Sequence, residues 1–363
     1  MYQKDQPYND LPGLPPAFDF NDVDILKKVN KANIALASFN GMANILPNRT
    51  IIIEPLSIKE AVASSGIENI NTTVAEVFRA ELFPQSEATT AQKETLHYRD
   101  ALIDGWRSVV DRQFLNTNDY SALQLHLEPT KPGIRRKDQT REPVRIVNST
   151  TKEVVYTPPE GHELICKLLK NYEDYYNDFS ETDGIDALIR LALLHYQFEA
   201  IHPFRDGNGR TGRILMVLYL VLVGRIDLPM LFISGYILEH RDEYYRRLRA
   251  VTERGEWKEW VLYILDAVIA QSRASEKTIL GIKKLMEDYK KKAMAEGLPD
   301  AGILVDYLFS KPFYTYKDMA ERVDIHRNTA AQYLAKLVEA GVVKKSIFKK
   351  EAVFFNPSFV SLL

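Results

Sequence analysis

HPFRDGNGRTGR, residues 202–213, carries three glycines, three arginines, a histidine and an aspartate directly before ILMVLYLVLV, residues 214–223, the most apolar run in the chain. Ten apolar residues fit a core helix and are far too few to span a bilayer, which takes about 20. A surface loop has no physical need for so much charge beside a buried segment. The twelve residues, called the motif below, therefore predict a polar site at the start of a buried helix.

The glycines of the motif favour an anion site built from backbone N–H groups. Such groups crowd an anion only where no Cβ intervenes, and Gly207, Asn208 and Gly209 supply that turn. If the next helix starts near Gly209, its first N–H groups and its positive dipole end point at the same place. Arg210 and Arg213 lie on one side of the first helical turn, where each can hold a different phosphate. The spacing predicts a polyphosphate ligand.

An aspartate and a histidine add a metal ligand and a base to this site. A bare carboxylate repels an anion, but the Asp206 carboxylate beside phosphates is the usual arrangement for Mg²⁺. The imidazole of His202, with an ordinary pKa of about 6.5, can take a proton from a hydroxyl that attacks a phosphate. Phe204 is expected to anchor the loop in the core. The motif differs from the Walker and dinucleotide patterns, because a helical segment precedes it.

Helical spacing of apolar residues dominates the rest of the chain. After an irregular arm over residues 1–20, we expect a helix over 22–46 and a helix that begins at Ser57, where Ser57 and Glu60 match a capping box. Two more helices are expected between 72 and 113, further helices over 163–199, with a central buried one from Asp186 to Glu199, and at least two over 236–293.

Two stretches depart from this helical pattern. β-branched runs on either side of a polar turn predict a β-hairpin over residues 144–157. Residues 301–363 give three short helices and a two-stranded ribbon, the outline of a winged helix-turn-helix. We predict an all-α, mainly helical fold with these two additions, divided into residues 1–115, a catalytic core over 116–296 and the winged helix over 301–363.

Charge and cysteine content exclude several classes of protein. The formal net charge is −2, from 47 Lys and Arg against 49 Asp and Glu, so no strong overall field attracts nucleic acid or a membrane surface. Cys166 is the single cysteine, which rules out an intrachain disulfide and a cysteine-based zinc cluster. Because no leader or long apolar run is seen, a cytoplasmic protein without membrane contact is the simplest expectation.

The motif resembles the signature of Fic proteins, H-x-F-x-[DE]-G-N-G-R-x-x-R, at every fixed position, and the resemblance extends over about residues 20–290. It implies a helical enzyme that transfers AMP from ATP, with Mg²⁺, to a Ser, Thr or Tyr hydroxyl of a target protein. It also implies that His202 is the general base and Asp206 the metal ligand. The implied nucleotide-binding residues are Gly207, Asn208, Gly209, Arg210, Thr211, Gly212 and Arg213.

The same resemblance implies a built-in inhibitor. Residues 64–69, SSGIEN, fit the inhibitory pattern [ST]-x-x-x-E-[GN] of Fic proteins, with Ser64, Glu68 and Asn69 in the fixed places. We call this stretch the inhibitory segment and expect its helix to span about residues 57–70. If Glu68 pairs with Arg213, the arginine is taken from the γ-phosphate and a like charge occupies the phosphate's place. The more common family variant has Gly in place of Asn69.

Two further assignments come from the resemblance. The hairpin at 144–157 stands where Fic proteins carry a flap that pairs its main chain with the target segment, although a purely structural hairpin stays open. The segment LFISGYILEHRDEYYRRL resembles the family's adenine pocket, and Glu239 and Tyr245 are its candidate residues. On physical grounds alone, tyrosines at helical spacing belong to the core more often than to a ligand site.

Several alternatives remain open at this point. The same site can remove AMP from a modified target, with Glu68 positioning water, or the chain can be a DNA-binding regulator that only senses nucleotide. The winged helix has a local surplus of three positive charges, nine against six, and polar residues His326, Arg327, Asn328 and Gln332 near the start of its recognition helix. It therefore serves either DNA or protein docking. Self-AMPylation and a homodimer also remain open.

Overall fold

The computed structural model describes two compact units, each discontinuous in sequence. Unit 1 contains Met1–Ala37 and Asp100–Gln271, and unit 2 contains Ser38–Arg99 and Ser272–Leu363. The boundaries fall within three helices, α1 (Val23–Ala43), α4 (Thr90–Arg112) and α11 (Trp257–Ala295). The division into residues 1–115, 116–296 and 301–363, which was predicted from the sequence, stays a prediction. The described residues are 2–46, 48–83, 87–136, 144–147, 151–180, 182–299, 301–348 and 350–363.

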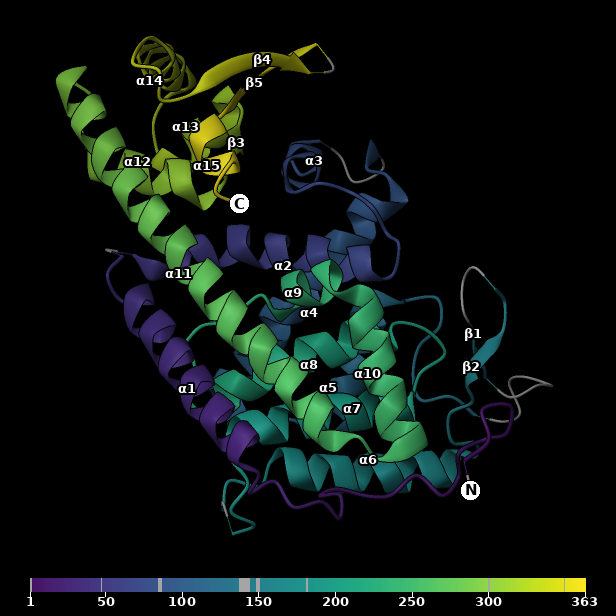
Figure 1. Ribbon diagram of the computed structural model, residues 1–363. Coiled ribbons are helices and arrows are strands. Elements are labelled where there is room, and N and C mark those ends of the chain that lie inside the picture. The colour runs from purple at the N-terminus through teal and green to yellow at the C-terminus, as the bar shows by residue number, and fades with distance from the viewer. Residues whose placement is uncertain are drawn as a thin grey trace. The chain divides into compact units, whose positions relative to one another are not determined.

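Unit 1 is built around two buried helices. Every residue of α7 (Ala187–Ile201) is buried, and almost every residue of α8 (Asn208–Leu222) is buried as well. These helices pack against each other, α6 (His162–Tyr176) packs on α7, and α5 (Thr117–Leu127) packs on α8 (Figure 1). A helix that is apolar on all faces belongs in the centre of a large domain, which confirms the prediction for both segments.

Unit 1 also contains two short strands and two further helices. They are the strands β1 (Ile146–Val147) and β2 (Val154–Tyr156), and the helices α9 (Ile233–Glu239) and α10 (Arg241–Arg254). The strands pair antiparallel, as predicted for the hairpin, whose residues 148–150 lie outside the described ranges. The N-terminal arm has no regular structure and is held by main-chain contacts, such as Tyr8 N–H to Thr157 O at 3.0 Å.

Unit 2 combines the helix of the inhibitory segment with the C-terminal elements. The elements before α4 are the 3-10 helix η1 (Arg49–Ile52), α2 (Ile53–Ile67) and α3 (Val74–Ala80). Those after α11 are α12 (Ala301–Ser310), β3 (Phe313–Tyr314), α13 (Tyr316–Val323), α14 (Arg327–Glu339), β4 (Lys344–Phe348), β5 (Glu351–Phe355) and α15 (Pro357–Val360). The sheet has the order β3-β5-β4, all antiparallel.

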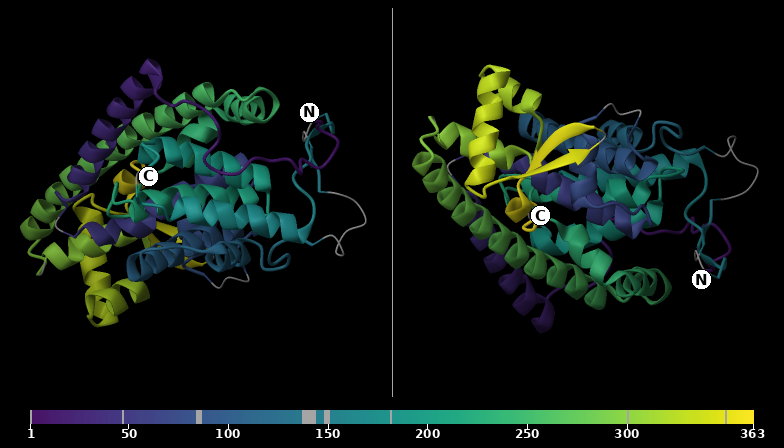
Figure 2. Two further views of the ribbon diagram at one scale, coloured as in Figure 1. Left: turned by 90° about the horizontal axis from the view of Figure 1, so that it is seen from below. Right: turned by 90° about the horizontal axis from the view of Figure 1, so that it is seen from above.

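The C-terminal elements form the predicted winged helix-turn-helix. Helices α13 and α14 pack against each other, and β4 and β5 make the ribbon that follows the recognition helix α14 (Figure 2). Among these C-terminal elements, the short strand β3 and the final turn α15 were not predicted. The prediction of a mainly helical fold with a hairpin and a winged helix is confirmed.

The start of the inhibitory helix differs from the prediction. α2 begins at Ile53 and not at Ser57. Pro55 lies in its first turn, where the missing N–H breaks no helical hydrogen bond, so the helix extends through it. Ser57 and Glu60 are fully buried instead of forming a capping box, and the Tyr98 hydroxyl donates to Glu60 at 3.2 Å.

None of the helices in the described ranges combines the length and the apolar composition that a membrane span requires.

Candidate active site

The motif connects the two buried helices of unit 1. α7 ends at Ile201, and His202 caps it in the left-handed conformation, with φ 47° and ψ 60°. Gly207 is the N-cap of α8, which begins at Asn208, next to the position predicted from the glycines. The histidine, the carboxylate and the helix N-terminus are therefore held by one short turn between two rigid helices.

A buried asparagine fixes the shape of this turn. Asn208 is 2% exposed, its Oδ1 accepts from the Phe204 N–H at 2.8 Å, and its Nδ2 donates to the Phe204 carbonyl at 2.9 Å. The Phe204 ring is fully buried, as predicted, and residue 204 also forms a β-bridge with Ile134. The side chain of Asn208 thus sets the geometry of the loop, while its backbone belongs to the first turn of α8.

Gly207 is required by the backbone at the helix start. Its φ is 81°, a region that other residues adopt at a cost, and a Cβ there would lie 3.2 Å from Cγ of Glu128. The Gly207 carbonyl accepts from both the N–H and the hydroxyl of Thr211, at 2.9 and 2.8 Å. The first N–H groups of α8 have no acceptor inside the helix, and the helix dipole makes this end favourable for an anion.

Asp206 is ionised at neutral pH by its neighbours. Burial opposes the charge, but the Lys131 ammonium at 2.5 Å and the Gly207 N–H at 2.9 Å outweigh it and hold the pKa of Asp206 below its usual value. The pair is partly exposed, with 49% of the Lys131 side chain and 43% of the Asp206 side chain accessible. Lys131 therefore places a positive charge at the carboxylate that the motif assigns to Mg²⁺.

The donor set around Asp206 fits a metal that arrives with a nucleotide. Within the described ranges, no three His, Cys, Asp or Glu side chains come together as a metal site. Mg²⁺ is usually held through one or two carboxylates together with phosphate oxygens and water. The single accessible carboxylate of Asp206, next to the N-terminus of α8, fits that requirement.

The two arginines of the motif are buried cations at the start of α8. The Arg210 side chain is 4% exposed and pairs with Glu128, the residue after α5. Arg213 is 2% exposed. Because a guanidinium does not lose its proton in proteins, both add positive potential to the helix N-terminus.

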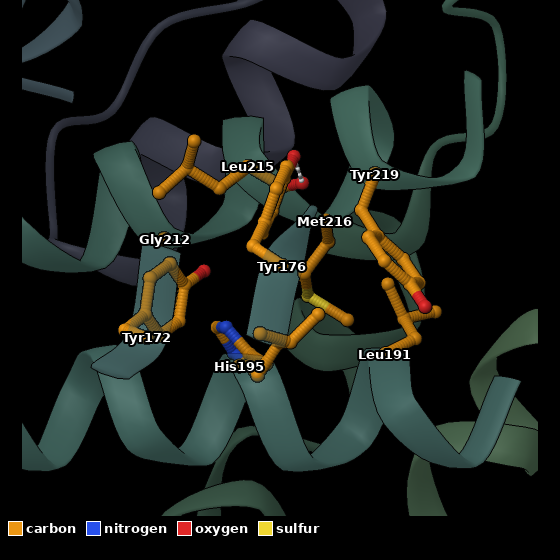
Figure 3. Close-up of a pocket in the computed structure, with 9 residues that line it drawn as sticks. Tyr172, Tyr176, Leu191, His195, Gly212, Leu215, Met216 and Tyr219 are labelled. Carbon is orange, nitrogen blue, oxygen red and sulfur yellow. Dashed lines mark hydrogen bonds between the residues drawn. The ribbon is translucent and has the colours of Figure 1, made fainter. Parts of the chain in front are cut away.

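His195 on α7 is not a second base. Burial, and after it the charge of Arg213, lowers the pKa of His195 to about 3, so this imidazole stays neutral. Its Nε2 lies 2.9 Å from the Tyr244 hydroxyl. The space that it lines with Tyr172, Tyr176 and Tyr219 between α6, α7 and α8 is too small for a water molecule (Figure 3). This region is core packing behind the motif and not a ligand site.

Gly212 explains how α8 approaches α7 so closely. A Cβ at this position would overlap the Glu199 carboxylate and lie 3.2 Å from the Phe198 ring. The glycine therefore serves helix packing, and it lies on the face of α8 turned toward α7 (Figure 3).

The end of helix α2 in the inhibitory segment explains why asparagine is tolerated at position 69. Ser64 is fully buried, and Glu68 is the exposed C-cap residue of α2. Asn69 follows with φ 63°, the left-handed conformation that Gly and Asn favour after a helix. The Gly-to-Asn variation is thus compatible with the same turn. Glu68 belongs to unit 2 and Arg213 to unit 1, so their pairing stays a prediction.

The two adenine-pocket candidates lie on neighbouring helices. Glu239 is the exposed last residue of α9, and Tyr245 on α10 is 37% exposed with its ring edge against Tyr244. The Arg241 guanidinium lies 5.8 Å from the Tyr245 ring centroid. Their role stays a prediction, as does that of the hairpin.

Side chains that reach the motif from α5 and the stretch after it were not predicted, among them those of Gln124, Glu128 and Lys131. Gln124 donates to the Asp206 carbonyl at 3.2 Å and to the Lys131 carbonyl at 2.9 Å, while Glu128 and Lys131 pair with the motif charges. All three lie on α5 or just after it, about 80 residues before their partners. Nothing in the local spacing of this stretch indicates such contacts.

The geometry defines a helical protein in which a buried helix start, two buried arginines, a carboxylate and a histidine come together in one turn. Two family models match the corresponding stretches, Fic/DOC family N-terminal at residues 26–107 and Fic/DOC family at residues 113–220. The chain belongs to the Fic/DOC family. A third model, Protein adenylyltransferase SoFic-like, C-terminal domain, matches residues 301–359.

Curated relatives match part of the chain. Protein adenylyltransferase fic-1 of Caenorhabditis elegans is 35% identical over 130 residues, which are 36% of this chain and 23% of the relative. Protein adenylyltransferase Fic of Drosophila mojavensis is 26% identical over 210 residues, 56% of this chain and 38% of the relative. The matched regions therefore span between 23% and 38% of the length of these relatives.

Solved structures share the fold. A Fic family protein from Desulfovibrio desulfuricans G20 matches with a TM-score of 0.59 at 18% identity, over 94% of this chain and 98% of that one. Fic-1 from C. elegans matches with a TM-score of 0.53 at 22% identity, over 72% of this chain and 74% of that one.

Proposed function

We propose that this chain is a protein adenylyltransferase that transfers AMP from ATP, with Mg²⁺, to a Ser, Thr or Tyr hydroxyl of a target protein. One observation carries the proposal. The turn from His202 to the start of α8 holds a histidine, a carboxylate and a glycine-capped helix N-terminus with two buried arginines. The curated relatives are named protein adenylyltransferases, which supports this activity.

Each group of the motif has a role in this reaction. His202 takes the proton of the target hydroxyl as its oxygen bonds to the α-phosphorus, and the bond from that phosphorus to the bridging oxygen breaks, so that pyrophosphate leaves. The first N–H groups of α8 bind the α- and β-phosphates, and Arg210 and Arg213 bind the β- and γ-phosphates. Mg²⁺ on Asp206 would neutralise phosphate charge.

The hairpin is suited to hold the target beside this site. β1 and β2 are short and pair only with each other in the part of the chain described, and on β2 the Val155 carbonyl accepts from the Tyr2 hydroxyl at 3.3 Å. The outer edge of β1 is therefore the one that suits pairing with an extended segment. Main-chain pairing tolerates many sequences, which suits an enzyme that selects a hydroxyl by position. The main-chain carbonyls and N–H groups of β1 are thus the proposed docking edge.

We also propose that Glu68 restrains the reaction by pairing with Arg213. The pair would withdraw the guanidinium from the γ-phosphate and place a carboxylate where a phosphate belongs. Since α2 ends at Ile67 and Asn69 turns the chain in the left-handed conformation, Glu68 occupies a fixed position at the helix end.

The test is AMP transfer from labelled ATP with Mg²⁺ in a cell lysate. Glu68→Gly should raise incorporation at least about fivefold, the lower end of ordinary coupling between sites. Glu68→Gly combined with His202→Ala should show none. Equal incorporation by wild type and Glu68→Gly refutes the inhibitory role, and incorporation that persists without His202 refutes the catalytic assignment. Mass spectrometry of the chain itself detects self-AMPylation, and a premade AMP adduct tests the reverse reaction.

A second binding function, to duplex DNA, is favoured by the exposed face of the winged helix. Arg327, Asn328 and Gln332 are exposed on α14, and Lys344 and Lys345 are exposed on the ribbon. A recognition helix with such side chains at its start fits the major groove, and ribbon lysines fit phosphates. About three phosphate contacts predict a log–log salt slope near −3. Absence of a duplex-dependent shift at low salt would rule this function out.

A further inference from the structure

The carbonyl groups at the end of α7 are bound by side chains from elsewhere in unit 1. The last carbonyls of a helix have no partner inside it, and here they lie next to the proposed base. The Tyr156 hydroxyl donates to the Ala200 carbonyl at 2.7 Å. The Arg135 guanidinium donates to the next two, through Nη2 to Ile201 O at 3.1 Å and through Nε to His202 O at 2.7 Å.

The backbone at His202 needs this support. Its left-handed conformation is disfavoured for a residue other than glycine, because Cβ lies too close to the following carbonyl oxygen. On its N-terminal side, the His202 N–H donates to Phe198 O at 3.0 Å, in the manner of a helix cap. On its C-terminal side, Arg135 binds the His202 carbonyl through Nε and the Pro203 carbonyl through its backbone N–H, the latter at 2.9 Å. Arg135 therefore fixes the backbone at His202, the residue that carries the imidazole.

The same guanidinium also reaches the base of the hairpin. Its Nη2 donates to Pro159 O at 2.5 Å, three residues after β2 ends. Arg135 is 6% exposed, and burial lowers its pKa to about 10, so it remains a cation at neutral pH. A cation is favoured at a helix C-terminus by the dipole. The fork of an arginine can bind three carbonyls at once, which a lysine cannot do with this geometry.

We infer that Arg135 is a positioning residue, which sets the orientation of His202 and couples it to the base of the hairpin that faces the target. This inference rests on the proposed AMP transfer. A displacement of a catalytic group by about 1 Å costs about 10²-fold in rate. Loss of Arg135 should displace the His202 imidazole, so it should lower the rate of AMP transfer and leave the binding of ATP unchanged.

The experiment uses the full chain in the Glu68→Gly background. Arg135→Met should lower kcat by about 10²-fold and leave KM for ATP within about threefold, and Arg135→Lys should recover only part of the loss. Arg136→Met is the matched control, because Arg136 is the exposed next residue, and its kcat should be unchanged. Thermal unfolding identifies any variant that does not fold. If Arg135→Met does not fold, the kcat and KM of Arg135→Lys test the positioning role.

The outcomes separate this inference from the proposed function. If the Glu68→Gly parent transfers no AMP, the proposed function fails. If the parent is active and both Arg135 variants keep kcat within about twofold, the positioning role is wrong. A rise in KM for ATP as large as the fall in kcat would also overturn it, because a general loss of structure weakens binding and chemistry together.

A second inference comes from the core of unit 2. The helix that carries the inhibitory segment and the winged helix share one buried cluster, formed by Ile58, Val77, Phe78, Leu96, Phe313 and Val353. The Arg79 guanidinium lies over two rings of the winged helix, 5.9 Å from Phe313 and 5.4 Å from Phe348. The chain end joins the contact, since Lys59 Nζ on α2 donates to Leu362 O at 3.4 Å.

We propose that the winged helix holds α2 in place and so controls the inhibition by Glu68. Ile58 lies on the same 15-residue helix that Glu68 caps, so a change in the packing of Phe313 or Val353 reaches the position of that carboxylate through one rigid element. This proposal also rests on the inhibitory role of Glu68. It gives the C-terminal module a regulatory function in addition to any ligand that it binds.

An epistasis measurement tests the coupling. Phe313→Leu should raise AMP transfer of the otherwise wild-type chain by about fivefold or more, and should change nothing in the Glu68→Gly chain, where the inhibition is already gone. Val338→Ala, an exposed change on α14, is the control and should have no effect in either chain. Equal effects of Phe313→Leu in both chains, or none in wild type, would refute the coupling. Lys59→Met provides a second variant if Phe313→Leu does not fold.

Discussion

Replacement of Asn208 by alanine removes the side chain that fixes the motif turn. Asn208 is 2% exposed and makes two hydrogen bonds with the backbone of Phe204, at 2.8 and 2.9 Å. Without the amide, a buried N–H and a buried carbonyl lose their partners, at about 1–3 kcal/mol each. The expected loss of stability is about 2–6 kcal/mol. Each kcal/mol lowers Tm by about 2–4 °C in a unit of this size.

The same change should also lower the rate of AMP transfer. Because Asn208 sets the distance between His202 and the first turn of α8, its loss displaces base and phosphates relative to each other, and about 10²-fold in kcat is expected. The assay is AMP transfer in the Glu68→Gly background at a temperature well below the Tm of the variant. Asn118→Ala, an exposed change on α5, should alter stability by less than about 0.5 kcal/mol and leave kcat unchanged. A variant at 208 with unaltered Tm and full activity would refute this account of the turn.

Three more changes test other contacts of the site. Lys131 and Mg²⁺ would compete for the Asp206 carboxylate, and Lys131→Met removes a partly exposed ion pair worth about 0.2–1 kcal/mol. The Mg²⁺ concentration for half-maximal transfer should therefore fall about 1.5–5-fold, and an unchanged Mg²⁺ requirement would contradict this competition. His195 is neutral in the folded state and gains a proton on unfolding below about pH 6.5, so it should reduce the free energy of unfolding by about 1.4 kcal/mol for each unit of pH lowered from 6 to 4. Urea titrations at several pH values give the free energy of unfolding as a function of pH, and this free energy should fall less steeply toward low pH for His195→Gln than for wild type. The same pH dependence in both chains would contradict the burial of a neutral imidazole. Gly207→Ala should weaken ATP binding in calorimetry, since its φ of 81° strains an alanine, and undiminished affinity would argue against this helix start as the phosphate site.

Local patterns in the sequence predict the elements that carry the motif. The all-round apolar composition of α7 and α8 indicates central helices, and the glycines at 207 and 209 place the start of α8 to within one residue. The hairpin and the order of helices and strands in the winged helix follow from β-branched runs and from the spacing of apolar residues. In each case the determining interactions lie within the segment itself.

Contacts between distant segments could not be predicted in this way. Glu128, Lys131 and Arg135 approach the motif from a stretch with no recognisable pattern, because only the packing of α5 on α8 brings them there. The start of α2 was misplaced for a related reason. Ser57 and Glu60 have the spacing of a capping box, but burial against partners such as Tyr98 decides their role.

The most direct test of the central claim is the structure of the Glu68→Gly chain with ATP and Mg²⁺. The account predicts the triphosphate at the first turn of α8, the metal on Asp206, and the His202 imidazole facing the α-phosphorus with room for an incoming hydroxyl. A triphosphate bound elsewhere, or an imidazole turned away from the α-phosphorus, would contradict it.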